Sequence, residues 1–599
     1  MTFFFTLTKG RKPFCVRKKI LMNLSPILKS VTKPGRYVGG EFGAVTKDPS
    51  EVDIRFALCF PDVYEIGMSN LGMRILYGLL NSRADTWCER AFAPWHDMED
   101  AMRQNAIPLF ALESGESIAH HDFIGFSLQY ELSYTNIVNM LELAGLPLLA
   151  ADRGEEHPLV IGGGPGTLNP EPVADFFDLF LVGDAEEALP ELCDLYVAMK
   201  KSGATRGDFL VAAAKIEGIY IPSLYTVTYN ADGTVAEYTP SHGASYPVKK
   251  RVLRDLDSGY FPTAPIVPNI EVVQDRITLE LQRGCGRACR FCQAGAAYRP
   301  IRQRSVETLL RHAKETYANT GYDEIGLASL SVSDYKGLDH LTDGLLAWTK
   351  DCRVNLSLPS QRADALTPEL MERVLKVRSS SFTFAPEAGT QRLRDAIRKD
   401  ITEEHIKNAC SLVFGAGKNS VKLYFMIGLP TETEEDIEGI AALARTALEC
   451  YYANPNRPKG GRPPEVGVSV SCFVPKPHTP FQWEPMNSVE QFQEKQERLR
   501  ELITDRKIKL SRHDARSSRI EAVFARGNRR LSAALLAAHS RRLRFCAWSE
   551  HFDYNGWLEC FTEVGIDPDF YTTRPLGKDE VFPWDVIDCG VKRDVLWKT

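Results

Sequence analysis

The sequence predicts an α/β protein: a doubly wound, Rossmann-like N-terminal domain, a partial (β/α)6 barrel and a small α-rich C-terminal region. Three observations lead to this prediction. Short apolar runs alternate with segments of helical periodicity in two separate series, a period-two segment lies between the series, and 599 residues are too many for one hydrophobic core. Because strands that alternate with helices form parallel sheets, each series predicts a parallel sheet of its own.

The composition is that of an ordinary globular chain, with 44% hydrophobic and 25% charged residues. A formal net charge of −6 gives no general argument for nucleic-acid binding. No apolar run of the sequence approaches the roughly 18–20 residues that a membrane span needs, so no membrane association is expected. The 14 cysteines are scattered singly outside residues 285–292, which indicates a reducing compartment and a cytoplasmic location.

Residues 1–35 form a basic N-terminal extension ahead of the first domain. Its apolar patch, "FFFTL", is shorter than the roughly 7–15 residues of a secretory signal, and no small-residue cleavage site follows it. We therefore expect a misassigned translation start, with Met22 as the true initiator.

The first series predicts an α/β domain over residues 36–202. A linker over 203–265 follows, in which apolar residues alternate in period two on both sides of an "NADG" turn, a pattern that predicts a β-hairpin. A helical pattern over 68–81 follows the first strand. The expected strands of the domain are 53–60, 122–127, 158–164 and 176–183.

The second series predicts the partial barrel over residues 266–487. In barrels of this kind the chemistry lies at the C-terminal ends of the strands. The charged helical segment 488–506 opens the C-terminal helical region, 488–599. The expected barrel strands are 277–281, 323–328, 354–358, 380–384, 420–427 and 466–474.

Three cysteines, Cys285, Cys289 and Cys292, follow the first barrel strand directly, in "RGCGRACRFCQAG". Thiolates suit zinc or iron–sulfur clusters. A structural zinc site takes four ligands, commonly as two C-x2-4-C pairs, and no second pair follows in the sequence. A four-iron cluster with three cysteine ligands keeps one iron open for a substrate or cofactor. Zinc and three unliganded thiols remain as alternatives.

The spacing C-x3-C-x-aromatic-C, with Phe291 as the aromatic residue, resembles the radical S-adenosylmethionine (SAM) superfamily. The resemblance implies a [4Fe-4S] cluster whose open iron binds SAM. One-electron reduction then cleaves SAM to a 5′-deoxyadenosyl radical, which abstracts a hydrogen atom from the substrate. It also implies a reductant protein such as flavodoxin or ferredoxin. The loop arginines Arg283, Arg287 and Arg290 are expected to offset the negative charge of the cluster.

The ends of the other barrel strands carry residues to which the resemblance assigns SAM binding. Ser333 and Asp334 stand where the family often has Gly-Gly-Glu, and they are expected at the methionyl amino group. The resemblance places Glu387 like the acid that binds the ribose of SAM. The guanidinium group of Arg362 suits the methionyl carboxylate of SAM. Taken singly, each such serine also fits a helix cap. The expected SAM-binding residues are Phe291, Ser333, Asp334, Ser360, Arg362, Glu387, Arg398 and Gly428.

The N-terminal series resembles a cobalamin-binding domain. "PDVYEIGMSNLG" is similar to the D-x-H-x-x-G motif, but Tyr64 replaces the histidine that would ligate cobalt from below. The resemblance therefore implies either cobalamin without this histidine ligand or a domain that binds no cobalamin and docks on the barrel. The residues of the resemblance are Asp62, Tyr64, Gly67, Ser127, Gly163 and Gly164.

Two further features follow the last barrel strand. His478, in "FVPKPHTPFQW", is expected to face the barrel mouth and contact substrate, with a rigid proline-rich turn as the alternative. The tail segment "HSRRLR", residues 539–544, is a local basic patch that is compatible with RNA or with a solvated face.

The pattern over residues 34–597 resembles a family of radical SAM proteins with a cobalamin-domain-like N-terminus. Its members occur with a small radical-SAM-associated protein, so a separate partner of this kind is expected. The leading hypothesis is a radical SAM enzyme, a transferase that carries out cobalamin-assisted methylation of an unactivated carbon.

Two alternatives differ from this hypothesis. The first is a methylthiotransferase acting on RNA or protein; such enzymes carry a second three-cysteine cluster, for which Cys59, Cys88 and Cys193 lack the spacing. The second is a non-enzymatic iron–sulfur protein that transfers electrons or serves as an RNA-binding scaffold.

Overall fold

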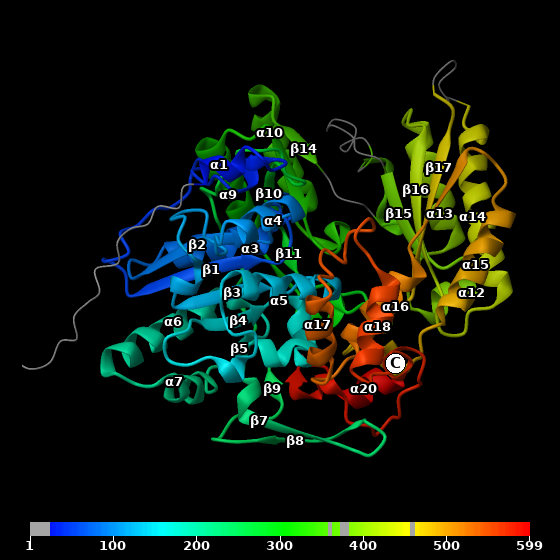
Figure 1. Ribbon diagram of the computed structural model, residues 1–599. Helices are drawn as coiled ribbons and strands as arrows, with labels where there is room; N and C mark the ends of the chain where they lie inside the picture. The colour runs from blue at the N-terminus through cyan, green and yellow to red at the C-terminus, as the bar shows by residue number, and fades with distance from the viewer. Residues whose placement is uncertain (1–23, 358–361, 370, 372–381, 456–461) are drawn as a thin grey trace, which may run out of the picture.

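The structure is a computed structural model that describes residues 24–357, 362–369, 371, 382–455 and 462–599. The N-terminal domain lies on one side of the molecule, and the strands of the second series lie in two groups, β10–β14 and β15–β18 (Figure 1). The C-terminal helices α16–α18 lie between the N-terminal domain and the second group (Figure 1). None of the helices in the described ranges is long and apolar enough to cross a membrane.

The N-terminal sheet has the strand order β2-β1-β3-β4-β5-β6, with only β6 antiparallel to its neighbour. This doubly wound order confirms the predicted fold and places a topological switch point between β1 and β3, where ligands bind in open α/β sheets. Helices α3 (Leu71–Asn81), α5 (Tyr134–Leu143) and α6 (Ala185–Ser202) connect the strands. The strands are β1 (Ile54–Phe60), β2 (Thr86–Phe92), β3 (Phe123–Ser127), β4 (Leu159–Gly163), β5 (Leu179–Leu181) and β6 (Ile219–Tyr220).

Strand β2 was not expected from the sequence, because "TWCERAF" carries two charged residues in its centre. All seven of its residues are buried, although β2 is the edge strand. Glu89 forms ion pairs with Arg55 at 2.6 Å and with His121 at 2.7 Å. Arg90 pairs with Glu41 at 2.8 Å and with a second carboxylate, that of Glu113. The paired charges explain why a polar sequence occupies a buried strand.

Apart from the short antiparallel pair β11–β12, the strands described in the second series pair in parallel. Within the described residues they form a three-stranded sheet, β10-β13-β14, and a four-stranded sheet, β15-β16-β17-β18. The six expected strands are present, and β18 is a seventh that follows the predicted barrel end at residue 487. The strands are β10 (Ile277–Glu280), β13 (Glu324–Ala328), β14 (Asn355–Ser357), β15 (Phe382–Glu387), β16 (Ser420–Ile427), β17 (Glu465–Cys472) and β18 (Ile508–Arg512).

Helices follow the strands of the second series and cover their outer faces (Figure 1). They begin with side-chain caps at several points; Ser305 and Ser488 each accept a hydrogen bond from the first turn of the helix that follows. These helices are α9 (Val306–Thr320), α10 (Leu338–Cys352), α13 (Glu403–Gly415), α14 (Glu434–Ala453) and α15 (Val489–Leu502).

The linker contains the expected hairpin, β7 (Tyr225–Tyr229) and β8 (Val235–Pro240), paired antiparallel. A second linker strand, β9 (Val248–Lys249), pairs in parallel with β19 (Ile587–Asp588) near the end of the chain. The end of the chain therefore returns to the linker and lies beside it.

The predicted α-rich C-terminal region is present and packs on the N-terminal domain. Its helices α16 (Ala515–Ala525), α17 (Leu531–Ser540) and α18 (Tyr554–Glu563) contribute buried side chains to the hydrophobic core of the N-terminal domain. Their apolar faces are shared with that core, so the region completes the first domain rather than standing beside it.

The basic residues of the tail are engaged in ion pairs. Arg544 is buried and pairs with Glu99 at 2.7 Å, and Arg541 pairs with Glu563. The basic patch expected in segment 539–544 is therefore largely neutralised by carboxylates and gives no support to an RNA-binding surface.

Replacement of Glu89 by Gln is expected to destabilise the fold at pH 7 by about 3 kcal/mol. Burial alone would raise the pKa of Glu89, but the hydrogen bond from His121, together with the Arg55 charge, lowers it to about 2. Because the pKa of Glu89 is lower in the folded protein than in the unfolded chain, its carboxylate stabilises the fold above the unfolded pKa of about 4.3. This stabilisation is lost as the pH falls toward 2. Urea unfolding at pH 7 and at pH 4 measures the difference.

Glu116→Gln is the matched control, because Glu116 pairs with the same arginine but its side chain is 28% exposed. Loss of this partly solvated ion pair should lower the free energy of unfolding by less than about 1 kcal/mol. Equal losses in the two variants would contradict the role assigned to Glu89.

Candidate functional site

The three cysteines lie in a loop held closed at its base by a two-stranded ribbon. Strands β11 (Gln282–Arg283) and β12 (Arg302–Gln303) pair antiparallel, and the cysteine loop, residues 284–301, connects them at the C-terminal end of β10. Gly284 has φ +95°, and a Cβ there would stand 2.6 Å from the Tyr298 carbonyl oxygen. Only glycine fits this start of the loop without strain.

The cysteine side chains are half-buried in this loop. Within the described ranges, no three His, Cys, Asp or Glu side chains converge closely enough to hold one metal ion. Three thiols gathered in one half-buried loop suit an iron–sulfur cluster, because thiolates are the ligands that such clusters take.

Burial raises the pKa of Cys289 to about 11, and it also raises the pKa of Cys292, so these two thiols stay protonated when no metal is bound. A bound metal overrides this effect, because coordination deprotonates a thiol outright.

Phe291, between Cys289 and Cys292, packs against a hydrophobic cluster that includes Leu393 and Phe473, so it anchors the loop to the second barrel sheet.

The loop arginines are already paired, which corrects the expectation that they offset the cluster charge. Arg283 forms ion pairs with three carboxylates. Arg287 pairs with Asp334 at 2.6 Å, and Arg290 donates to the Ala396 carbonyl at 2.7 Å. These bonds tie the loop to the surrounding strand ends.

The expected SAM-binding residues that the structure describes lie around this loop. Arg287 donates to Asp334 and lowers the pKa of its carboxyl group. The neighbouring Ser333 hydroxyl is buried and has no hydrogen-bond partner among the residues that the structure describes. Arg362 pairs with Asp364 at 2.9 Å, just after the third strand. Ser360 lies outside the described residues.

Strained backbone marks the ends of the later strands. Glu387 has φ +69° and pairs with Lys399 at 2.9 Å, while Arg398 has φ +54°. Left-handed conformations of non-glycine residues are uncommon and concentrate at functional sites. Gly428, at φ +78°, stands after β16, and a Cβ there would lie 2.4 Å from the ring of Phe492. Packing against α15 is therefore one physical reason for this glycine.

A cavity of about 350 Å³ lies between the C-terminal edge of the N-terminal sheet and the cysteine loop. Three expected residues of the cobalamin-like motif line it: Ser127, Gly163 and Gly164. On the opposite side it is lined by Arg283 and Tyr298 of the second series. The cavity therefore joins the switch point of the first sheet to the loop that carries the cysteines.

The other three motif residues do not line this cavity. Tyr64 is buried, and its hydroxyl donates to Glu41 Oε1 at 2.8 Å. Asp62 accepts from the indole of Trp548 at 3.0 Å, so it holds the C-terminal region. A Cβ on Gly67 would meet the Phe92 ring at 2.3 Å. In this chain, these motif positions serve packing.

His478 is also buried and does not line the cavity, contrary to the expectation that it faces substrate. Its Nε2 lies 3.0 Å from the Leu168 carbonyl oxygen, and the ring contacts the Cys589 thiol. Burial would lower the pKa of His478, but Cys589 raises it. Burial would likewise raise the pKa of Cys589, but the charges of His478 and Lys250 lower it.

The His478–Cys589 pair could not be found from the sequence. Cys589 is one of many single cysteines, and 111 positions separate the two residues along the chain. Parallel pairing of β19 with β9 brings Cys589 beside Lys250 and toward His478.

Comparison with known proteins identifies the family. A family model described as "Radical SAM superfamily" matches residues 279–444, and one described as "Radical SAM proteins, N-terminal" matches residues 72–222. Together the two matches span more than half of the chain. The chain belongs to the radical SAM superfamily. Its cofactors are accordingly a [4Fe-4S] cluster and SAM, and it is an enzyme.

Two relatives place this radical SAM protein among similar sequences. The "Uncharacterized protein MJ0966" of Methanocaldococcus jannaschii is 28% identical over 482 residues, which cover 80% of this chain and 90% of that protein. The "Putative methylthiotransferase MJ0865" of the same organism is 26% identical over 183 residues, 29% of this chain and 40% of that protein.

Solved structures show a remote likeness. The radical SAM methyltransferase TsrM from Kitasatospora setae is 13% identical with a TM-score of 0.45, covering 69% of this chain and 73% of that one. The cobalamin-dependent enzyme OxsB is 15% identical with a TM-score of 0.42, covering 65% of this chain and 52% of that one. At these values the likeness does not extend to function.

Replacement of Cys285, Cys289 or Cys292 by Ala is expected to abolish SAM cleavage and lower bound iron after anaerobic reconstitution. Each thiolate would hold a different iron, so loss of one would leave the cluster incompletely ligated. Iron analysis and the visible absorbance of the cluster measure the effect, and circular dichroism should change little.

Cys352→Ala is the control, because Cys352 is exposed at the end of α10. It should retain iron as the unmodified protein does. Full iron content in any of the three loop variants would contradict the ligand assignment.

Replacement of His478 by Gln should raise the pKa of Cys589, because burial of the thiolate would then be opposed by Lys250 with no imidazole beside it. Alkylation of the peptide that carries Cys589, followed by mass spectrometry across pH 6–10, measures the pH midpoint. An upward shift relative to the unmodified protein is expected. An unchanged midpoint would show that the imidazole does not stabilise the thiolate.

Proposed function

We propose that this protein cleaves SAM reductively at a cluster held by Cys285, Cys289 and Cys292 and transfers a methyl group to a carbon of its substrate with the help of cobalamin. The observation that carries the proposal is the cavity between the switch point of the N-terminal sheet and the cysteine loop. It gives a second cofactor a place directly beside the first.

When bound, the cluster and SAM supply a 5′-deoxyadenosyl radical that removes a hydrogen atom from the substrate. The protein's part is to hold and orient. Cys285, Cys289 and Cys292 would hold the cluster through three thiolates and would leave one iron open for SAM. Lys399 and Arg362 act at short range on Cys289, so they stand beside the cluster site, where they suit a carboxylate. Glu387, paired with Lys399, is the acceptor for ribose hydroxyls.

The cavity suits part of a cobalamin molecule. Its volume of about 350 Å³ lies at the low end for small-molecule sites, so a nucleotide-sized arm fits and the whole cofactor does not. Gly164 has φ +99°, and nothing lies within 4 Å of a Cβ at Gly163, which lets a ligand approach the backbone closely. The lining contains no histidine, so cobalt bound beside it would lack an imidazole ligand from these residues.

Methylthiotransferase activity is the second candidate, because three of the relatives carry that description. They match 29%, 27% and 46% of this chain. The activity as expected from the sequence requires a second cysteine-held cluster. Cys59, Cys88 and Cys193 of the N-terminal domain are buried, and burial raises the pKa of each, which suits structural thiols.

The test is anaerobic reconstitution of the full chain, followed by SAM and dithionite, with 5′-deoxyadenosine measured by chromatography. Formation of 5′-deoxyadenosine in the unmodified protein and its loss in Cys289→Ala are expected. No product from a protein with a complete four-iron cluster would contradict SAM cleavage. Retention of hydroxocobalamin after desalting, followed by its visible spectrum, supports the methylation arm, and its absence would contradict that arm alone.

A further inference from the structure

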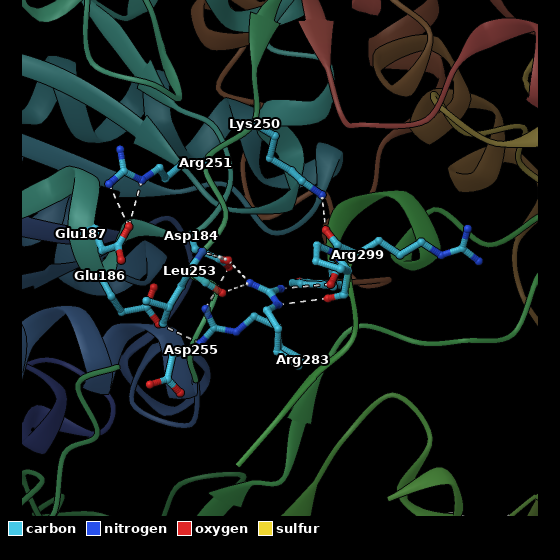
Figure 2. A network of polar contacts seen from close by, with 12 residues as sticks. Asp184, Glu186, Glu187, Lys250, Arg251, Leu253, Asp255, Arg283 and Arg299 are labelled. Atoms are coloured by element: carbon cyan, nitrogen blue, oxygen red, sulfur yellow. Dashed lines mark hydrogen bonds and ion pairs between the residues drawn. The ribbon is translucent and has the colours of Figure 1, made fainter. Parts of the chain in front are cut away.

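Asp184 bonds to both arginines that flank the cysteine loop. It follows β5 and precedes α6, at the edge of the N-terminal sheet. Its Oδ1 accepts from Arg283 Nη1 at 2.9 Å, and its Oδ2 pairs with Arg302. Arg283 ends β11 and Arg302 begins β12, so one carboxylate of the first domain holds the two ends of the loop. Figure 2 shows the network of polar contacts around Asp184 and Arg283.

Both arginines are buried and depend on these partners. Arg302 is 6% exposed, and within the described residues Asp184 is its one ion-pair partner; the remaining bonds go to backbone carbonyls such as Leu253 at 2.8 Å. Arg283 also pairs with Glu186 at 2.8 Å and with Glu280 at 3.0 Å. Removal of the Asp184 charge therefore leaves Arg302 buried without a counter-charge, which is a costly state.

A second support comes from the linker. Lys250 donates to the carbonyl oxygens of Ala296 and Ala297, at 2.7 and 3.0 Å. It also donates to the Arg299 carbonyl oxygen at 2.9 Å, as Figure 2 shows. These carbonyls lie at the end of the short helix that follows Cys292. The cysteine loop is thus held from outside the barrel, by the N-terminal domain at its base and by the linker near its last cysteine.

We propose that Asp184 is a positioning residue for the cluster: its paired arginines fix the geometry of the cysteine loop, so the first domain determines how tightly the barrel holds its cluster. Asp184, Arg283 and Lys250 all line the cavity as well. The supports of the loop and the walls of the cavity are therefore the same side chains. The proposal rests on the proposed function only for the presence of the cluster.

The test uses Asp184→Asn in the full chain, which keeps the shape of the side chain and removes its charge. Before reconstitution, hydrogen–deuterium exchange should rise in peptides from residues 284–301 and stay unchanged in peptides from β1 and β3. After reconstitution, a chelator should remove iron about 10-fold faster than from the unmodified protein, as when an outer partner of a metal ligand is lost.

Glu187→Gln is the matched control. Glu187 stands on the same helix and pairs with Arg251 of the linker at 2.8 Å, but its side chain is 46% exposed (Figure 2). This replacement should change neither the hydrogen–deuterium exchange of the cysteine loop nor the rate of iron loss. Arg302→Lys is the second variant, because it keeps the charge and loses the forked geometry. Iron loss intermediate between Asp184→Asn and the unmodified protein is expected.

Three results would overturn the proposal: unchanged loop exchange in Asp184→Asn, exchange that rises equally throughout the N-terminal domain, or iron loss matching that of Glu187→Gln. If Asp184→Asn does not fold, Arg302→Lys decides the question by the same two measurements. Failure of the proposed function is separate. An unmodified protein that forms no 5′-deoxyadenosine would contradict SAM cleavage. The exchange comparison that tests Asp184 would remain valid.

Discussion

The candidate site depends on holding the loop that carries the three cysteines in one shape. A loop of 18 residues, 284–301, has no fixed shape by itself. The β11–β12 ribbon closes its base, Phe291 anchors it in an apolar cluster, and ion pairs to Asp184 and Asp334 hold its flanks. The fold supplies each of these contacts from a different part of the chain.

The domains are interleaved rather than strung in series. The C-terminal helices complete the core of the N-terminal domain, and β19 pairs with a strand of the linker. Lys250 of that linker then reaches the end of the cysteine loop. The cysteine loop is therefore in contact with the linker, and the linker in turn is paired with the end of the chain.

Buried charge explains most of the differences between the sequence-based expectations and the structure. Arg283 and Arg544, expected near a cluster or on an RNA-binding face, are paired with carboxylates from distant segments. Strand β2 was not predicted, because charged residues such as Glu89 and Arg90 usually lie at the surface. In the structure each of them has buried partners. No local pattern predicts such partners, because they come from positions tens to hundreds of residues away along the chain.

The sequence by itself determined the two α/β series, most of their strands, and the three cysteines with the family they indicate. These are local properties: apolar periodicity and ligand spacing are complete within short segments. Tertiary structure alone decided that Ser127, Gly163 and Gly164 share a cavity with Arg283 while Tyr64 is sealed away, and that His478 meets Cys589. The physical reason is that strand order and chain return bring these groups together, and neither is encoded in any one segment.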